Sequence, residues 1–174
     1  VHVVFDNTHG RAESGPDVYE QRRAFRQEEN VRERGYGVTA NLIVRREAYD
    51  AAGGFDPKRL SGGDVDFGRR LGHAGRQLEY SAAVAVKHPS RSSLREVLKK
   101  RGRVVSGSLL LTQGRPAPVM RYLGWHARRA LSDSRSGIAD LWRRPVLAAR
   151  YLVTVWAVFA VTVVTYAKAR RSTA

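Results

Sequence analysis

Two carboxylates in a glycine-rich segment are the residues of this chain best suited to chemistry. Asp64 and Asp66 lie two positions apart in segment 61–70, Ser-Gly-Gly-Asp-Val-Asp-Phe-Gly-Arg-Arg. Glycines such as Gly62 and Gly63 allow positive φ angles and close approach of a ligand. A carboxylate after such a turn, with cations beside it, can accept a proton or hold a charged substrate. The alternative is structural, because an aspartate can cap a following helix, where the helix dipole favours negative charge.

Further candidates follow residue 84. His88 comes directly after the apolar residues 84–86 and Lys87, which places it at a predicted strand end, where binding sites of α/β folds open. A neutral imidazole there can ligate a metal, and the alternative is a surface histidine in a turn. Arg91 and the cluster 99–103, with Arg101 and Arg103, carry guanidinium groups that suit a diphosphate. A solvated helix face or a contact with lipid headgroups explains the same charges equally well.

The elements that must position these residues alternate between strands and helices. Strands are predicted over 1–6, 37–45 and 78–86, and helices over 46–52, 64–74 and 93–105, the first two ending at glycines. The polar segment 7–17 predicts a loop, and 18–34 predicts a short, largely exposed helix or an ordered loop. Thr39 and Asn41 are small polar residues inside the predicted strand 37–45, where they bind a ligand or make ordinary strand-edge hydrogen bonds.

The C-terminal part has a different pattern. Residues 119–131 combine an apolar side with arginines off it, which is typical of a helix in a membrane interface. Residues 151–167 carry no charge, and with 146–149 they reach the ~20 residues that a membrane-spanning helix needs. We therefore expect a transmembrane helix over 145–168, with a buried packing helix as the alternative.

Composition limits the partners and the chemistry. The chain has 174 residues, with 31 Lys and Arg against 16 Asp and Glu, a formal charge of +15. Such a field attracts polyanions, and since Asp133 and Asp140 are the only acids beyond Glu96, the basic half favours a membrane surface. The absence of cysteine excludes disulfides and thiolate metal sites. No Walker-type loop and no dinucleotide-binding glycine fingerprint occur.

The order of five segments resembles the C-terminal half of a family 2 glycosyltransferase catalytic domain. They are Gly37 to Arg46, Gly53-Gly-Phe-Asp56, Ser61 to Arg70, Ala74-Gly75, and Val86-Lys-His-Pro-Ser-Arg91. The resemblance covers residues 1–107 and implies an α/β fold of the GT-A type: a mixed, mostly parallel sheet with helices on both faces that binds a nucleotide-sugar. It also implies an inverting transfer of a sugar, hexosyltransferase-like, to an acceptor hydroxyl.

The resemblance assigns roles to individual residues. Asp64 takes the place of the catalytic base, and Gly63 replaces the glutamate that often precedes it. The substrate-binding positions implied here are Thr39, Asn41, Gly62, Gly63, Asp66, Arg91, Arg101 and Arg103. His88 matches a position where some members place a metal ligand. The basic helix lacks the Gln-x-x-Arg-Trp motif of processive members, so processive synthesis is not expected.

The family's cofactor motif is missing from this sequence. Members bind a divalent metal, Mg or Mn, mainly through an Asp-x-Asp motif, and none occurs upstream of Asp64. Because the chain begins at Val1 in what reads as a strand, we expect a fragment without its N-terminal part, inactive by itself. The expected organisation is a partial catalytic domain over 1–107, a basic interfacial segment over 108–144, the transmembrane helix, and a basic tail over 169–174.

The leading hypothesis is therefore a glycosyltransferase at the cytoplasmic face of an inner or plasma membrane. Its expected partners are a nucleotide-diphosphate sugar donor, a glycan or lipid-linked acceptor, and the membrane, with no nucleic acid. Two alternatives remain: a non-enzymatic basic module that binds membranes or nucleic acid, and a degenerate transferase-like scaffold, suggested by Gly63.

Overall fold

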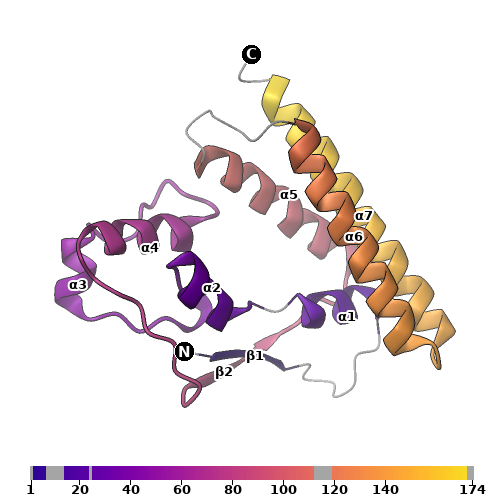
Figure 1. The fold of residues 1–174 in the computed structure, drawn as a ribbon, viewed down its shortest axis with the longest axis horizontal. Coiled ribbons are helices and arrows are strands. Elements are labelled where there is room, and N and C mark those ends of the chain that lie inside the picture. The colour runs from indigo at the N-terminus through magenta and orange to yellow at the C-terminus, as the bar shows by residue number, and fades with distance from the viewer. Residues whose placement is uncertain (1, 7–13, 24, 112–118, 172–174) are drawn as a thin grey trace. The chain divides into compact units, whose positions relative to one another are not determined.

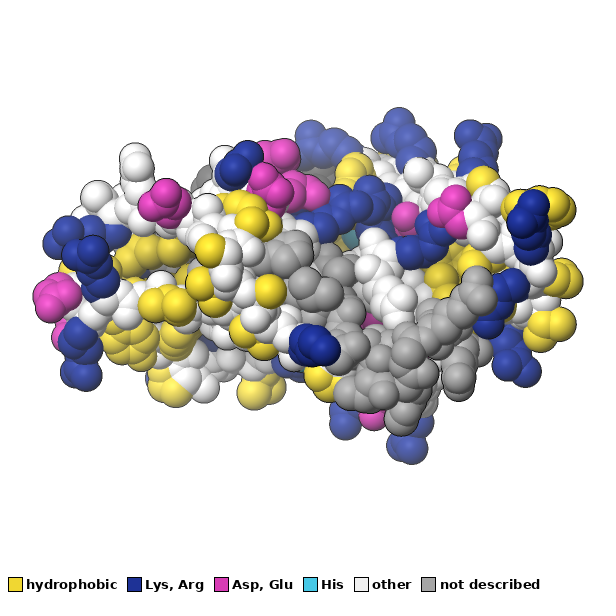
Figure 2. Space-filling view, turned by 90° about the horizontal axis from the view of Figure 1, so that it is seen from below, with side chains coloured by type: hydrophobic (Ala, Val, Ile, Leu, Met, Phe, Trp, Pro, Cys, Tyr) yellow, Lys and Arg dark blue, Asp and Glu magenta, His cyan; other side chains and the backbone are white. Residues whose placement is uncertain are grey.

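A computed structural model describes residues 2–6, 14–23, 25–111 and 119–171 (Figure 1). The chain divides into two units, one made of Val1–Thr8 and Arg23–Pro89, the other of His9–Arg22 and Ser90–Ala174. Figure 2 shows Lys and Arg side chains spread over one face of the molecule, with hydrophobic side chains between them.

The elements in chain order are β1 (His2–Asp6), α1 (Gly15–Arg22), α2 (Gln27–Arg34), the 3₁₀ turn η1 (Thr39–Asn41), α3 (Arg46–Ala51), α4 (Gly63–His73), β2 (Ala85–Pro89), α5 (Leu94–Leu111), α6 (Val119–Leu141) and α7 (Pro145–Arg171).

The first unit is built on two parallel strands. Strands β1 and β2 pair in register from His2 opposite Ala85 to Asp6 opposite Pro89. The strand predicted over 1–6 is confirmed, whereas the one predicted over 78–86 begins only at Ala85. These are the two strands among the described residues, so the larger mixed sheet is not seen there.

The strand predicted over 37–45 is wrong, because a buried side chain holds this segment as a turn. The Gln27 amide donates to the carbonyl oxygens of Val38 (3.1 Å) and Asn41 (2.9 Å) and accepts from the Val38 N–H (2.8 Å). Gln27 is 3% exposed. It therefore satisfies backbone groups that a strand would have offered to a neighbouring strand.

Helices α3 and α4 carry the core of the first unit. Buried Phe67 and Leu71 on α4 pack with Ala52, which follows α3, and the ring of Phe55 lies 4.4 Å from that of Phe67. Helix α3 ends before Gly53 and Gly54, both with positive φ, as the sequence predicts. Helix α4 agrees with its prediction to within one residue at each end.

In the second unit, α7 packs against α1, α5 and α6. Its buried face joins Tyr151, Val155 and Val158 to Val18 of α1 and Val97 of α5. The prediction of a largely exposed segment over 18–34 is wrong for α1, in which residues 15–20 are buried. Of its buried acids, Glu20 forms ion pairs with Arg91 and Lys100, and Asp17 accepts a hydrogen bond from the Ser90 hydroxyl.

Helices α5 and α6 are confirmed as helices but extend beyond the predicted ends at 105 and 131. Within α7, Pro145–Ala169 is long and apolar enough to cross a membrane, judged by length and composition alone, and a third of its most apolar window is buried. Its exposed face carries Val146, Val153 and Trp156. One face of α7 thus packs on protein and the other is apolar and uncovered in the described part of the chain.

Candidate active site

The first turn of α4 presents the two predicted carboxylates. Gly62 precedes the helix with φ 79°, a left-handed conformation that favours glycine. No side chain caps the helix, and the Asp64 carboxylate instead accepts a hydrogen bond from the Val65 N–H at 2.9 Å. The capping alternative is therefore wrong in its stated form: Asp64 lies inside the first turn, where the helix dipole still favours its charge.

Asp66 is neutralised by two arginines. Arg59 Nη2 lies 3.1 Å from one carboxylate oxygen and Arg70 Nη2 2.9 Å from the other, and Arg70 Nε also donates to it. Arg70 additionally bonds the Ala52 carbonyl, which ties the end of α3 to α4. The Asp66 side chain is 18% exposed. This arrangement makes Asp66 a structural residue that fixes the two helices around the turn at Gly62.

Asp64 has a different environment. Among the described residues it forms no ion pair, so its carboxylate charge is not compensated there. It lies close enough to Tyr36 to contribute to the pKa of that phenol. Burial is the main cause that raises the pKa of Tyr36 above 10.0; a hydrogen bond with Arg34 and its charge lower it, and the Asp64 charge raises it. Two acids two residues apart thus have different environments: Asp66 is paired with arginines, whereas Asp64 has no ion pair among the described residues.

Close packing at Gly68 holds Asp64 beside Tyr36. A Cβ at Gly68 would lie 2.5 Å from the Tyr36 Cβ and 2.7 Å from the Gly35 carbonyl oxygen, both far inside contact distance. By contrast, a Cβ at Gly63 would meet no atom within 4 Å. The structure therefore has room for a Cβ at position 63, where the family resemblance often places a glutamate. Tyr36 was not singled out by the sequence, and no local pattern around it indicates this position.

The polar residues at 39–41 differ in exposure. Thr39 is exposed on η1, whereas Asn41 is 7% exposed and donates from its side-chain amide to the Val84 carbonyl at 3.3 Å. Asn41 thus connects η1 to the residue before β2. This contact agrees with the structural alternative given for Asn41 in the sequence.

His88 lies near the end of β2. Its Nδ1 is 2.9 Å from the Pro89 carbonyl oxygen, and its ring meets the ring of Phe25 edge-on at 5.1 Å. Within the described residues, no three His, Asp or Glu side chains gather into a set that could hold a metal. Asp66 does not fit such a site either, because its oxygens already face two arginines. The described residues therefore do not form a site for the metal that the resemblance implies.

The three predicted phosphate-binding arginines belong to the second unit. Arg91 Nη1 lies 2.8 Å from the carboxylate of Glu20, which is 4% exposed and also pairs with Lys100 at 3.0 Å. Arg101 Nε donates to Thr162 Oγ1 at 2.7 Å, and its Nη2 lies 3.2 Å from His126 Nδ1. Both guanidinium groups are thus engaged in joining helices. Arg103 is exposed on α5.

A parallel strand pair, a glycine turn and a helix that presents an unpaired carboxylate describe part of an α/β enzyme fold, joined to a basic helical unit. The chain belongs to the family described as glycosyl transferase family group 2, whose sequence model matches residues 2–172. This confirms the resemblance found in the sequence, and the family fits the GT-A fold.

A curated relative agrees with this assignment. The chain is 30% identical over 102 residues to the glycosyltransferase AglE of Haloferax volcanii. The match covers 59% of this chain and 33% of the relative, so the chain spans about a third of the length of the protein it matches. No solved structure matches the chain.

Proposed function

We propose that this chain is the acceptor-side and C-terminal part of a membrane-associated glycosyltransferase in which Asp64 is the general base. The observation that carries the proposal is the contrast between the two carboxylates. Asp66 is held by Arg59 and Arg70, whereas Asp64 has no ion pair within the described residues. A carboxylate whose oxygens are not held by cations can accept a hydrogen bond, and then a proton, from an acceptor hydroxyl.

The reaction is a single displacement at the anomeric carbon. Asp64 accepts the proton of the acceptor hydroxyl, whose oxygen forms a bond to the anomeric carbon. The bond from that carbon to the diphosphate oxygen breaks, and its electron pair leaves with the nucleoside diphosphate. Attack opposite to the leaving group inverts the anomeric configuration. The Asp64 proton returns to solvent after the product leaves.

Other residues have supporting roles in this proposal. Thr39 at the exposed η1 turn and the backbone at Gly62 and Gly63 contact the acceptor. The role of Arg103 as a diphosphate contact is implied by the family resemblance alone. Arg91 and Arg101 act mainly in holding the second unit together, through Glu20 and Thr162. The role of His88 as a metal ligand is implied by the family resemblance alone. Members of the family bind the metal mainly through an Asp-x-Asp motif, which this sequence lacks upstream of Asp64. The isolated chain is for that reason expected to be inactive.

In this proposal residues 1–107 are the catalytic part, 108–144 the basic interfacial segment, 145–168 the membrane helix and 169–174 a basic tail. The membrane helix would hold the site near a lipid-linked acceptor or a growing glycan at the cytoplasmic face. The length and composition of Pro145–Ala169 support a position of this helix in the membrane.

The test replaces Asp64 by asparagine in the full-length protein. Asp64→Asn keeps the side-chain shape and removes the base, so transfer should fall by about 10²–10⁴-fold while binding of the nucleotide-sugar is retained. Asp50→Asn is the matched control, because Asp50 is 55% exposed and pairs only with the exposed Arg46. An Asp64→Asn protein that transfers at the rate of the control would refute the assignment.

A further inference from the structure

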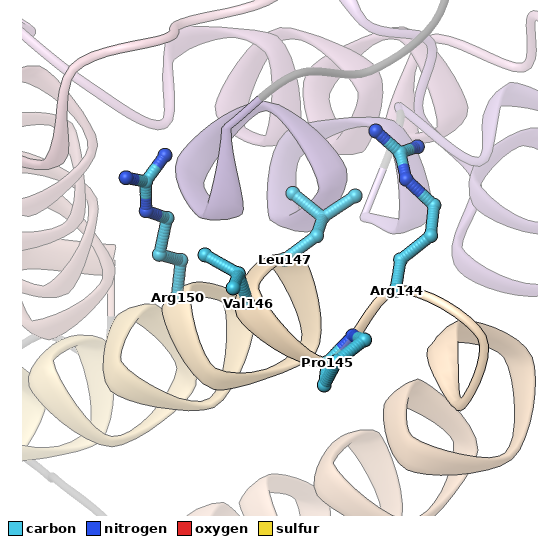
Figure 3. A pocket seen from close by; sticks show the side chains of 5 residues that line it. All are labelled: Arg144, Pro145, Val146, Leu147 and Arg150. Atoms are coloured by element: carbon cyan, nitrogen blue, oxygen red, sulfur yellow. The ribbon is translucent and has the colours of Figure 1, made fainter.

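Helix α6 lies alongside α7 over most of the uncharged part of α7 (Figure 1). The rings of Tyr122 and Tyr166 stack at 4.1 Å, and the Tyr151 hydroxyl donates to the Asp133 carbonyl oxygen at 3.2 Å. Tyr151 and Tyr166 are 15 positions apart, which corresponds to about 22 Å of helix. A short turn joins the two helices, and Figure 3 shows the first turn of α7 with Pro145 at its start. The helices therefore form an antiparallel pair, the α6–α7 hairpin.

Charged side chains of the neighbouring helices lie beside the middle of α7. On α6, Arg128 and Arg129 come between the two residues that contact α7. On α5, Arg101 donates from its Nε to Thr162 Oγ1 of α7 at 2.7 Å. If α7 crossed a bilayer, these three guanidinium groups would enter the hydrocarbon core, where charged side chains are rare and costly. The packing of α7 therefore disfavours a membrane-spanning position.

The outer face of α6 carries an apolar stripe that no other part of the described chain covers. Met120, Leu131, Ile138 and Trp142 follow one another at intervals of 11, 7 and 4 residues, which brings them to one side of a helix. Each of these four side chains is at least 47% exposed. Tryptophan is enriched at membrane–water interfaces. An exposed stripe of this kind is typical of a helix that lies in the plane of a membrane surface.

A row of arginines runs along α6 beside the apolar stripe. Arg121, Arg128 and Arg135 recur every seven residues, and all three are exposed. The two acids of α6, Asp133 and Asp140, pair with other arginines. None of the three arginines of the row forms an ion pair among the described residues. The row therefore complements the negative charge of anionic phospholipids.

We propose that the α6–α7 hairpin lies along the surface of an anionic membrane, with the apolar stripe of α6 in the interface and its arginine row at the lipid phosphates. Helix α7 then lies in the plane of the membrane, which differs from the transmembrane helix expected from the sequence. The inference rests on the membrane association of the proposed function and gives its geometry. It does not depend on Asp64, because both of its tests measure the position of the chain on lipid.

The orientation is tested by labelling two cysteines that flank α7. The sequence contains no cysteine, so Arg143→Cys/Arg171→Cys introduces one at each end of α7, both at exposed positions. The full chain is reconstituted into sealed vesicles of phosphatidylcholine and phosphatidylglycerol in equal parts. A membrane-impermeant polyethylene glycol maleimide is added, and the number of tags on each molecule is read from its shift on a gel. Labelling in detergent is the control that both cysteines react.

The two orientations predict different numbers of tags. A hairpin along the surface places both cysteines on the same side of the bilayer, so each molecule should carry two tags or none. A helix that crosses the bilayer places them on opposite sides, so each molecule would carry a single tag. Single tags would overturn the proposed orientation and leave the role of Asp64 unaffected.

The arginine row is tested by flotation of the full chain with vesicles of the same composition. The variant Arg121→Gln/Arg128→Gln/Arg135→Gln is compared with Lys58→Gln/Arg69→Gln/Arg76→Gln, which removes three exposed charges from the first unit. Loss of the row should weaken partitioning into the vesicles about 100-fold, the equivalent of three cations at an anionic surface, and the control should lose much less. Far-UV circular dichroism checks that both variants retain their helices. Equal losses in the two variants, or no flotation of the unmodified chain, would overturn the proposal.

Discussion

The packing of α4 at Gly68 offers the sharpest test of how the site is positioned. A Cβ at Gly68 would lie 2.5 Å from the Tyr36 Cβ and 2.8 Å from its Cα, so Gly68→Ala forces α4 away from residues 35–36. Overpacking of this kind costs about 1–3 kcal/mol. The alanine recovers about 0.5–1 kcal/mol through its higher helix propensity. The net expectation is a loss of about 1–2 kcal/mol, with Asp64 displaced from Tyr36.

Gly72→Ala is the matched control one turn further along the same helix. A Cβ at Gly72 would meet no atom within 4 Å, so only the gain in helix propensity remains. Hydrogen exchange followed by mass spectrometry reports the opening of α4 directly, without requiring that the whole chain unfold in one step. Gly68→Ala should speed exchange in 63–73 about fivefold to thirtyfold, and Gly72→Ala should slow it. Equal exchange in the two variants would refute the close approach of α4 to Tyr36.

Two further predictions concern the neighbours of Asp64. Asp66→Asn removes the carboxylate that Arg59 and Arg70 share, and leaves Arg59 with Asp56 alone. It should lower the free energy of unfolding of the first unit by about 2 kcal/mol, against less than about 1 kcal/mol for exposed Asp50→Asn. Urea titration measures both, and equal losses would contradict the structural role of Asp66. Burial raises the pKa of the Tyr36 phenol above its usual value of 10.0. The stability that this raised pKa contributes is therefore fully present below pH 10.0, and it is lost as the pH rises through the raised pKa. Stability should therefore fall less steeply in alkali for Tyr36→Phe than for the unmodified protein, and identical slopes in pH-dependent urea titrations would contradict this environment.

Local patterns were sufficient to predict the element that carries the site. The apolar spacing in 65–74 and the glycines on either side predicted α4 to within one residue, because a helix depends on neighbours three and four positions apart. The same segment identified both carboxylates. The pair of Asp66 with Arg70 is local, one turn along α4, whereas Arg59 reaches Asp66 only across the turn at Gly62.

Elements that depend on distant partners could not be predicted. The apolar residues of 37–45 are typical of a strand, but Gln27, more than ten residues away, binds the backbone there and prevents one. Helix α1 looks exposed in sequence, whereas Asp17 and Glu20 are buried because Ser90, Arg91 and Lys100 contact them. Tyr36 enters the site through its contact with α4, which no spacing in the sequence encodes.

The assignment of Asp64 as the base is tested most directly by the rate of sugar transfer in the full-length protein, compared between Asp64→Asn and the control Asp50→Asn. We predict that Asp64→Asn loses transfer by about 10²–10⁴-fold with nucleotide-sugar binding unchanged, whereas Asp50→Asn retains both. An Asp64→Asn protein that binds the donor and transfers sugar at the rate of Asp50→Asn would contradict the account.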